Sequence, residues 1–191
     1  SWSGLYNLGD LNGDGYQDLG FGDGDFSFIF WGKSFFNATY DLALENPPVN
    51  ITVFDNEDLG YDLVNGITGV GDIDGDGYDD VTFKHSYYDS SVGTFVNEIV
   101  VLYGQQTWAG LYDEDVGMGG LDFLTINIPT DNFYATAVLP LGDMDGDGNN
   151  EFGITVTTSE AYSKNDGILI WNGSESINSN DFSVPLKQSF F

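Results

Sequence analysis

One acidic loop recurs three times in the 191-residue chain, and its residue types suit calcium chemistry. The copies begin at Asp10, Asp72 and Asp143, which gives spacings of 62 and 71 residues. Each copy places oxygen-bearing side chains at loop positions 1, 3, 5 and 9 and glycines at positions 4 and 6. Calcium takes roughly six to eight oxygen ligands in a flexible cage, and glycine lets the chain curl back through positive φ. We therefore predict three calcium sites.

The predicted ligands combine the side chains at positions 1, 3, 5 and 9 with the backbone carbonyl at position 7. They are Asp10, Asn12, Asp14, Tyr16 and Asp18 in the first loop; Asp72, Asp74, Asp76, Tyr78 and Asp80 in the second; and Asp143, Asp145, Asp147, Asn149 and Glu151 in the third. Without an ion, each facing carboxylate pair would cost about 1–4 kcal/mol. Position 8, for example Asp79, is expected to point away from the ion.

Two other interpretations of the loop are disfavoured by its residues. A solvated turn of Asp, Asn and Gly would explain one copy, but three copies in the same register disfavour it. An EF-hand or dockerin loop opens with the same nine positions, and an EF-hand needs a bidentate Glu at position 12 and flanking helices. Position 12 is Phe21, Phe83 and Ile154, inside apolar runs typical of strands. The EF-hand interpretation therefore fails.

The segments around the loops predict an all-β fold. Each loop is followed by a run rich in β-branched or aromatic residues, and a later run ends on an aromatic residue close to Gly, as in Phe26 to Gly32, Ile99 to Gly104 and Ile168 to Gly173. A repeat of this length suits about four strands plus loops. We predict three such units, at residues 1–58, 59–130 and 131–191, the first starting almost at its loop.

At these residues the chain resembles the FG-GAP repeats of the integrin α-subunit β-propeller. In the second repeat, Leu59-Gly60 is similar to the "FG" element, Asp72 to Asp80 to the calcium loop, and Ile99 to Gly104 to the strand that ends in aromatic-Gly. The resemblance implies that the three units are β-propeller-type blades. It also implies that a calcium loop joins the first two strands of each blade. Similar repeats also occur in bacterial surface proteins and in some polysaccharide-active enzymes.

The predicted number of blades does not determine how the protein assembles. Propeller rings typically hold about 4–8 blades, so three blades imply a piece of a longer propeller or copies that stack blade to blade. Such copies would close a ring or run on as a filament. We therefore expect as partners other blades, copies of the chain, or an extracellular protein or glycan ligand.

Composition excludes several function classes. The chain has 31 Asp and Glu against 4 Lys and no Arg, for a formal charge of −27, and this polyanion disfavours nucleic acid and membrane surfaces as direct partners. The longest wholly apolar stretch, Ile99 to Tyr103, is too short to span a bilayer. No Cys and a single His, His85, make thiol, zinc and triad catalysis improbable, so we expect no enzyme activity.

The sequence favours a secreted or cell-surface calcium-binding module of an adhesion or surface-assembly protein, in which calcium rigidifies the blades. Two alternatives stay open: a structural subunit of an extracellular fibre, and the propeller module of a polysaccharide-active enzyme. A carboxylate pair acting on glycosides is compatible with the many acids, and Trp2, Trp31, Trp108 and Trp171 offer a sugar platform, although core packing is the better interpretation for Trp31 and Trp171. The sequons at Asn37, Asn50 and Asn172 predict glycosylation, with Asn50 the weakest because it adjoins a predicted strand.

Overall fold

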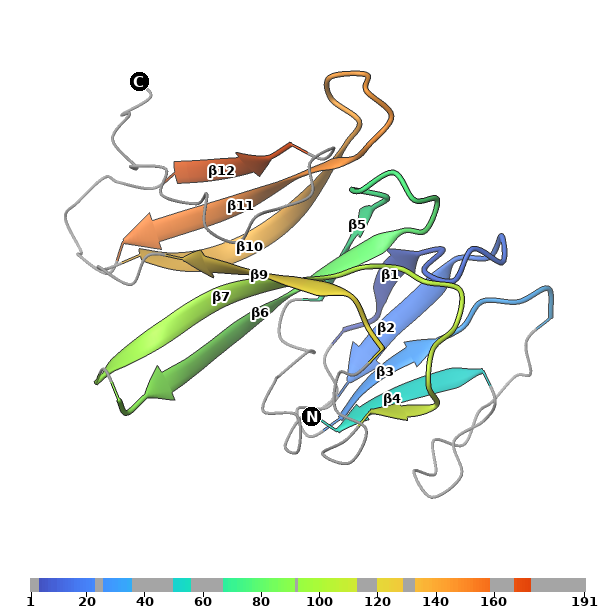
Figure 1. The fold of residues 1–191 in the computed structure, drawn as a ribbon, viewed down its shortest axis with the longest axis horizontal. Helices are drawn as coiled ribbons and strands as arrows, with labels where there is room; N and C mark the ends of the chain where they lie inside the picture. The colour runs from blue at the N-terminus through green and yellow to red at the C-terminus, as the bar shows by residue number, and fades with distance from the viewer. Residues whose placement is uncertain are drawn as a thin grey trace.

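The fold is known from a computed structural model that describes residues 4–22, 26–35, 50–55, 67–91, 93–112, 120–128, 133–158 and 167–172. Every regular element among these residues is a β-strand, arranged in three sheets (Figure 1). The predicted all-β class is thus confirmed for the described part of the chain. No helix long and apolar enough to cross a membrane occurs in that part.

The first sheet has five strands in the order β1-β2-β3-β4-β8. They are β1 (Tyr6–Gly9), β2 (Asp18–Gly22), β3 (Phe26–Phe30), β4 (Ile51–Asp55) and β8 (Leu111–Tyr112). The first four pair antiparallel in chain order, whereas β8 pairs parallel with β4. A strand from much later in the chain therefore closes one edge of the first sheet.

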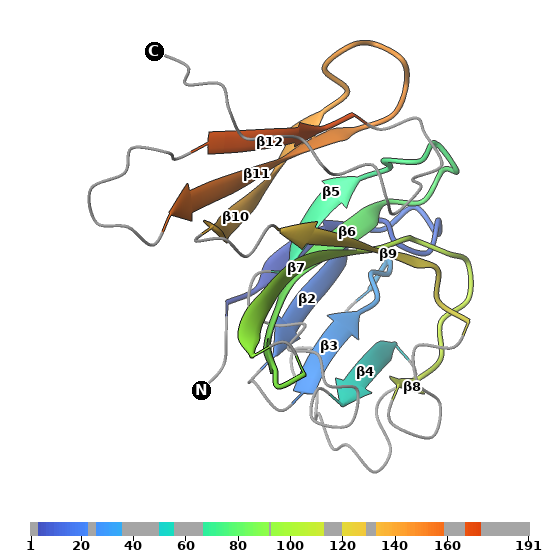
Figure 2. The same ribbon diagram turned by 60° about the vertical axis from the view of Figure 1, so that its left-hand side comes forward.

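The other two sheets repeat the same antiparallel order. The second runs β5 (Thr68–Gly71), β6 (Asp80–Asp89), β7 (Thr94–Leu102) and β9 (Phe123–Ile128), and the third runs β10 (Phe133–Gly142), β11 (Glu151–Thr158) and β12 (Gly167–Trp171). The three acidic loops lie at equivalent places, between β1 and β2, β5 and β6, and β10 and β11. Figures 1 and 2 show all three projecting from the same side of the molecule.

The sheets stack face to face through two apolar cores. One core joins the first sheet to the second and includes Leu8, Leu11 and Ile29 against Val81 and Phe83. The other joins the second sheet to the third and includes Val70, Ile73, Ile99 and Val101 against Phe152 and Ile154. Because the second sheet is covered on both faces, β7 carries an unbroken apolar run from Ile99 to Leu102 rather than an alternating pattern.

The sheets do not follow the predicted blade boundaries in one place. Leu111 and Tyr112 fall inside the predicted second blade, residues 59–130, yet they form the outer strand of the first sheet. The ring of Tyr112 stacks on Phe54 of β4 at a centroid distance of 4.9 Å, and Tyr112 is buried. Burial of this aromatic surface explains why the two-residue strand joins the first sheet.

Candidate metal centres

A glycine bulge starts each acidic loop. The register of the first strand shifts at its end, so that Gly9, Gly71 and Gly142 lie opposite position 9 of their own loops, Asp18, Asp80 and Glu151. All three glycines have positive φ, between 69° and 88°, a conformation that other residues adopt at a cost. The bulge re-aims the chain, so that position 1 and position 9 sit side by side at the base of the loop.

The aspartate at position 1 organises the loop backbone. Asp72 Oδ1 accepts hydrogen bonds from the amides of Gly75 (2.8 Å) and Asp76 (3.1 Å), and its Oδ2 accepts from Gly77 N (2.9 Å). Asp10 accepts from Asp14 N and Gly15 N in the same way. Asp143 accepts from Gly146 N (2.6 Å) and Gly148 N (3.1 Å). Each loop therefore wraps around the carboxylate that opens it.

The carboxylate at position 9 is buried and ties three segments together. Asp80 is fully buried; its Oδ2 accepts from Ile73 N (2.8 Å) in the loop, and its Oδ1 accepts from Gly104 N (2.8 Å) beyond the third strand. Asp18 does the same with Leu11 N (2.9 Å) and Gly32 N (2.7 Å). The glycine two residues beyond the third strand of each of these sheets, Gly32 or Gly104, thus contacts the loop.

Burial makes the charged form of these two carboxyls costly. Desolvation is the largest influence and raises the pKa of Asp80 from 3.8 to about 8 and that of Asp18 to about 6, against the opposing effect of their backbone donors. The neighbouring carboxylates Asp74 and Asp72 push the pKa of Asp80 the same way. Buried carboxylates that face like charges need either a proton or a cation.

The third loop departs from this pattern at two places. Its position 9 is Glu151, which is buried and accepts from Met144 N through Oε2 (2.6 Å). With its amide nitrogen turned toward the loop, Asn172 donates to Asp145 Oδ2 (3.1 Å) and to Glu151 Oε1 (3.2 Å). Asn172 follows Trp171 of β12 and occupies the place that Trp31 and Tyr103 take after the corresponding strands. The third sheet therefore has an amide side chain where the other two have an aromatic ring.

Carboxylates from positions 1, 3 and 9 converge in two of the loops. One oxygen each from Asp72, Asp74 and Asp80 lies within 4.8 Å of the others, and Asp143, Asp145 and Glu151 form a second such group. Oxygens bound to one calcium ion at about 2.4 Å lie at most about 4.8 Å apart, so these groups fit a shared ion. The first loop has Asn12 at position 3, which gives an amide oxygen instead of a third carboxylate.

Positions 5 and 7 are held by a local turn. The side chains of Asp14, Asp76 and Asp147 accept from the amide of the residue two positions later, at 2.8–2.9 Å. These three carboxylates lie outside the converging groups. The amides at position 7, which belong to Tyr16, Tyr78 and Asn149, are the donors in these turns.

The side chain at position 8 contacts the neighbouring sheet. Asp79 Oδ2 accepts from Asp10 N (2.7 Å), and Asp79 N donates to Asp10 O (3.0 Å). A Cβ on Gly9 would collide with the Asp79 side chain. The expectation that position 8 simply points away was incomplete, because the neighbouring loop, invisible in a single repeat, gives Asp79 a partner.

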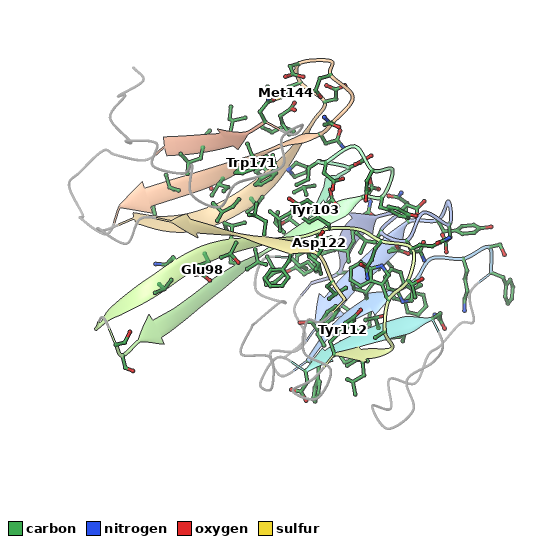
Figure 3. The ribbon with its side chains drawn as sticks, in the orientation of Figure 1. Glu98, Tyr103, Tyr112, Asp122, Met144 and Trp171 are labelled. Carbon is green, nitrogen blue, oxygen red and sulfur yellow. The ribbon has the colours of Figure 1, made fainter. Side chains whose placement is uncertain are left out.

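Two residues outside the loop motif act on the second loop. Tyr103 follows β7, and its backbone N–H donates to Asp122 O (3.0 Å). The two residues lie side by side in Figure 3. Burial raises the pKa of the Tyr103 hydroxyl to about 12, helped by the charges of Asp80, Asp74 and Asp122. Burial likewise raises the pKa of Asp74, with Asp76 the next cause and Asp122 a lesser one. The spacing of the loop motif gave no signal for Asp122.

The predicted glycosylation sites have three different placements. Asn37 lies outside the described residues. The Nδ2 atom of Asn50 is buried, which opposes attachment of a glycan there. Asn172 is exposed as a residue, but its amide nitrogen is the atom that faces the third loop.

The tryptophans that are described belong to the cores. Trp171 is buried and stacks on Phe152 with ring centroids 6.0 Å apart. Trp31 packs with Trp108 at 5.4 Å, and its Nε1 donates to Thr52 Oγ1 (3.0 Å). Trp2 and the side chain of His85 lie outside the described part. Trp31 and Trp108 are half-buried and pack against the core between the first and second sheets.

No family model matches the chain, and no curated protein matches its sequence. The resemblance to FG-GAP repeats therefore stays a prediction that depends on the loop residues themselves. The geometry adds three equivalent acidic loops, two of them with three converging carboxylate oxygens.

Proposed function

We propose that the chain is an extracellular calcium-binding repeat module of an adhesion or surface-assembly protein, and that it is not an enzyme. Its three sheets would be propeller-type blades, each with one calcium ion at its acidic loop. The observation that carries the proposal is the recurrence of one hydrogen-bond framework, from position 1 to the loop amides, in all three loops.

The donor set leaves room for an ion. A carboxylate offers about four lone-pair sites. Asp72 uses three of them on backbone amides and Asp80 uses two, so both retain acceptor capacity. The oxygens of positions 1, 3 and 9 would hold the ion together with the carbonyl of position 7 and, through a side-chain shift or a water, position 5. All of these are hard oxygen donors, which suit calcium.

Bound calcium would stiffen the junction between strands. Asp80 already connects the second loop to Gly104 beyond β7, and Asp10 connects the first loop to Asp79 of the next sheet. An ion at each loop neutralises the facing carboxylates and keeps position 9 ionised in its buried place. Calcium would thereby favour one fixed arrangement of the sheets, which suits a module that presents a surface.

The proposed extracellular setting agrees with the calcium affinity that is typical of such modules. Extracellular calcium modules bind with Kd of about 10⁻⁴–10⁻³ M, so millimolar calcium would fill the loops whereas cytosolic calcium would not. The burial of Trp171 and the packing of Trp31 in the core favour assembly or protein binding over a sugar-processing role.

Thermal melts in calcium and in EDTA test the proposal, with magnesium at equal concentration as the control. Each site adds RT ln(1 + [L]/Kd), about 1 kcal/mol when calcium is several-fold above Kd. Three sites then add about 3 kcal/mol, which raises the melting temperature by about 6–12 °C for a chain of this size. Equal melting temperatures in calcium and EDTA would contradict the proposal.

A further inference from the structure

The contact between neighbouring sheets occurs twice in the same form. At the first junction, Asp79 at position 8 bonds the backbone of Asp10 in the preceding loop. At the second, the backbone N–H of Asn150, at position 8, donates to Asp72 O (2.7 Å), and a Cβ on Gly71 would collide with the Asn150 side chain. In the first two loops, the loop backbone therefore forms a seat for the residue at loop position 8 of the following sheet.

The residue at loop position 7 also packs against the loop of the preceding sheet, and this contact likewise occurs twice. A Cβ on Gly13, at position 4 of the first loop, would collide with the ring of Tyr78, and one on Gly75 would collide with Asn149. The equivalent glycines of the third loop, Gly142 and Gly146, have nothing within 4 Å of such a Cβ. The third loop thus presents the same seat with no occupant from the described residues.

Next to this site on the third loop lies an apolar face that is exposed to solvent in the third sheet and buried in the other two. We define the trailing face as three equivalent positions: the residue two before the loop aspartate, loop position 2, and a central residue of the third strand. In the first two sheets these residues are at most 2% exposed: Leu8, Leu11, Ile29, Val70, Ile73 and Val101. In the third sheet they are Leu141 (37% exposed), Met144 (62%) and Ile170 (59%); Figure 3 shows Met144 on the third loop.

The first sheet has the complementary surface, which we call the leading edge. It consists of Tyr16 at position 7, Gln17 at position 8 and Leu19 at the start of β2. In the second sheet the equivalents Tyr78, Asp79 and Val81 all pack on the sheet before them. In the first sheet Tyr16 is 42% exposed, Leu19 is 37% exposed, and Gln17 is exposed as well.

We propose that the trailing face of the third sheet binds the leading edge of a second copy of this chain. Gln17 of the copy would sit on Gly142 beside Asp143, Tyr16 would cover Gly146, and Leu19 would pack against Leu141 and Met144. This contact continues the junctions that the chain already makes between its own sheets. Phe28 and Phe30 on the first sheet are buried within one chain, so the copy binds through the loop end of that sheet.

Such a contact is heterologous, because it joins two different surfaces. Repetition of a heterologous contact builds a ring or an open filament rather than a closed pair. The net charge of −27 opposes the approach of two copies, and salt near 0.1 M confines that repulsion to about 10 Å. Association is therefore expected to strengthen as salt is added, since the contact itself is apolar.

Sedimentation velocity of the full chain over a concentration series tests the proposal, in calcium and in EDTA. Ile170→Lys damages the trailing face and Leu19→Lys damages the leading edge. Leu5→Lys is the matched control. It adds the same charge at an exposed residue that directly precedes β1, at the end of that strand away from the loop. We expect the unmodified chain and the control to associate, and each interface variant to associate at least about tenfold more weakly, a loss of about 1.4 kcal/mol.

Mixing the two interface variants gives the sharpest outcome. The Ile170→Lys chain keeps its leading edge and the Leu19→Lys chain keeps its trailing face, so the mixture should form one-to-one pairs that grow no further. The proposal is overturned if the unmodified chain stays monomeric, if Leu5→Lys weakens association equally, or if the mixture does not pair. Association in EDTA supports the contact even if calcium has no effect, so this test is separate from that of the calcium sites.

Discussion

Replacing Asp79 tests how the first two sheets are joined. Asp79→Ala removes a part-buried hydrogen bond of 2.7 Å in which a carboxylate accepts from Asp10 N. Hydrogen bonds to charged groups contribute about 1.5–3 kcal/mol, and the unpaired Asp10 amide adds to the cost. With an m-value of about 2 kcal/mol/M in urea, a loss of about 2 kcal/mol lowers the unfolding midpoint by about 1 M.

Two further variants separate the hydrogen bond from the charge. Asp79→Asn removes the negative charge and keeps a carbonyl acceptor, so we expect a smaller loss than in Asp79→Ala. Gln17→Ala changes the same loop position in the first sheet, where the residue is exposed, and should cost less than about 0.5 kcal/mol. Urea unfolding of all three is measured in calcium and in EDTA. If Asp79→Ala is no less stable than Gln17→Ala or Asp79→Asn, the junction is not held in this way.

Three more predictions concern the loops and the core. Asp76→Ala should lower calcium affinity in isothermal titration while Asp79→Ala leaves it nearly unchanged; equal affinities would show that the loop register is wrong. In EDTA the free energy of unfolding should fall as the pH rises from about 4 to about 8. The folded pKa values of Asp18 (about 6) and Asp80 (about 8) lie above the ordinary 3.8. In this pH range the folded state therefore binds more protons than the unfolded state, and it loses stability as those protons leave. Calcium should oppose that fall, and urea unfolding against pH reveals both; a metal-free stability that rises over this window would refute the argument. Trp171→Ala should cost about 3–5 kcal/mol in the same assay, since its ring is buried against Phe152, and a loss under 1 kcal/mol would place it outside the core.

The loop frameworks could be predicted because they are local. Position 1 bonds amides three to five residues away, so the spacing of Asp and Gly alone carries the geometry. Only part of the role of position 9 could be predicted from the sequence. Its contact inside the loop is local, but the bond from Asp80 to Gly104 spans 24 residues and depends on the third strand ending beside the loop.

The contacts between sheets could not be predicted from one repeat. The residue at position 8 differs among the loops, as Gln17, Asp79 and Asn150, so it carries no repeated signal. The glycine before each loop was a possible signal, because Gly9 and Gly71 make space for the next sheet.

The sequence pattern did not reveal the β8 pairing or the role of Asn172, each for its own reason. A strand of two residues is too short to show a periodic pattern, and it joins β4 because Tyr112 stacks on Phe54. In the sequence, Asn172 stands out only as part of a sequon. The register of β12 places it where Trp31 and Tyr103 stand in the other sheets, next to Asp145 and Glu151.

Counting the bound ions tests the central proposal most directly. Equilibrium dialysis against calcium buffers up to the millimolar range should give three ions per chain, and two for Asp72→Asn, which weakens position 1 of the second loop. The Asp79→Asn chain, changed by the same chemistry outside the ligand set, should keep three. No saturable calcium, or three ions still bound by Asp72→Asn with unchanged affinity, would contradict the assignment of these loops as calcium sites.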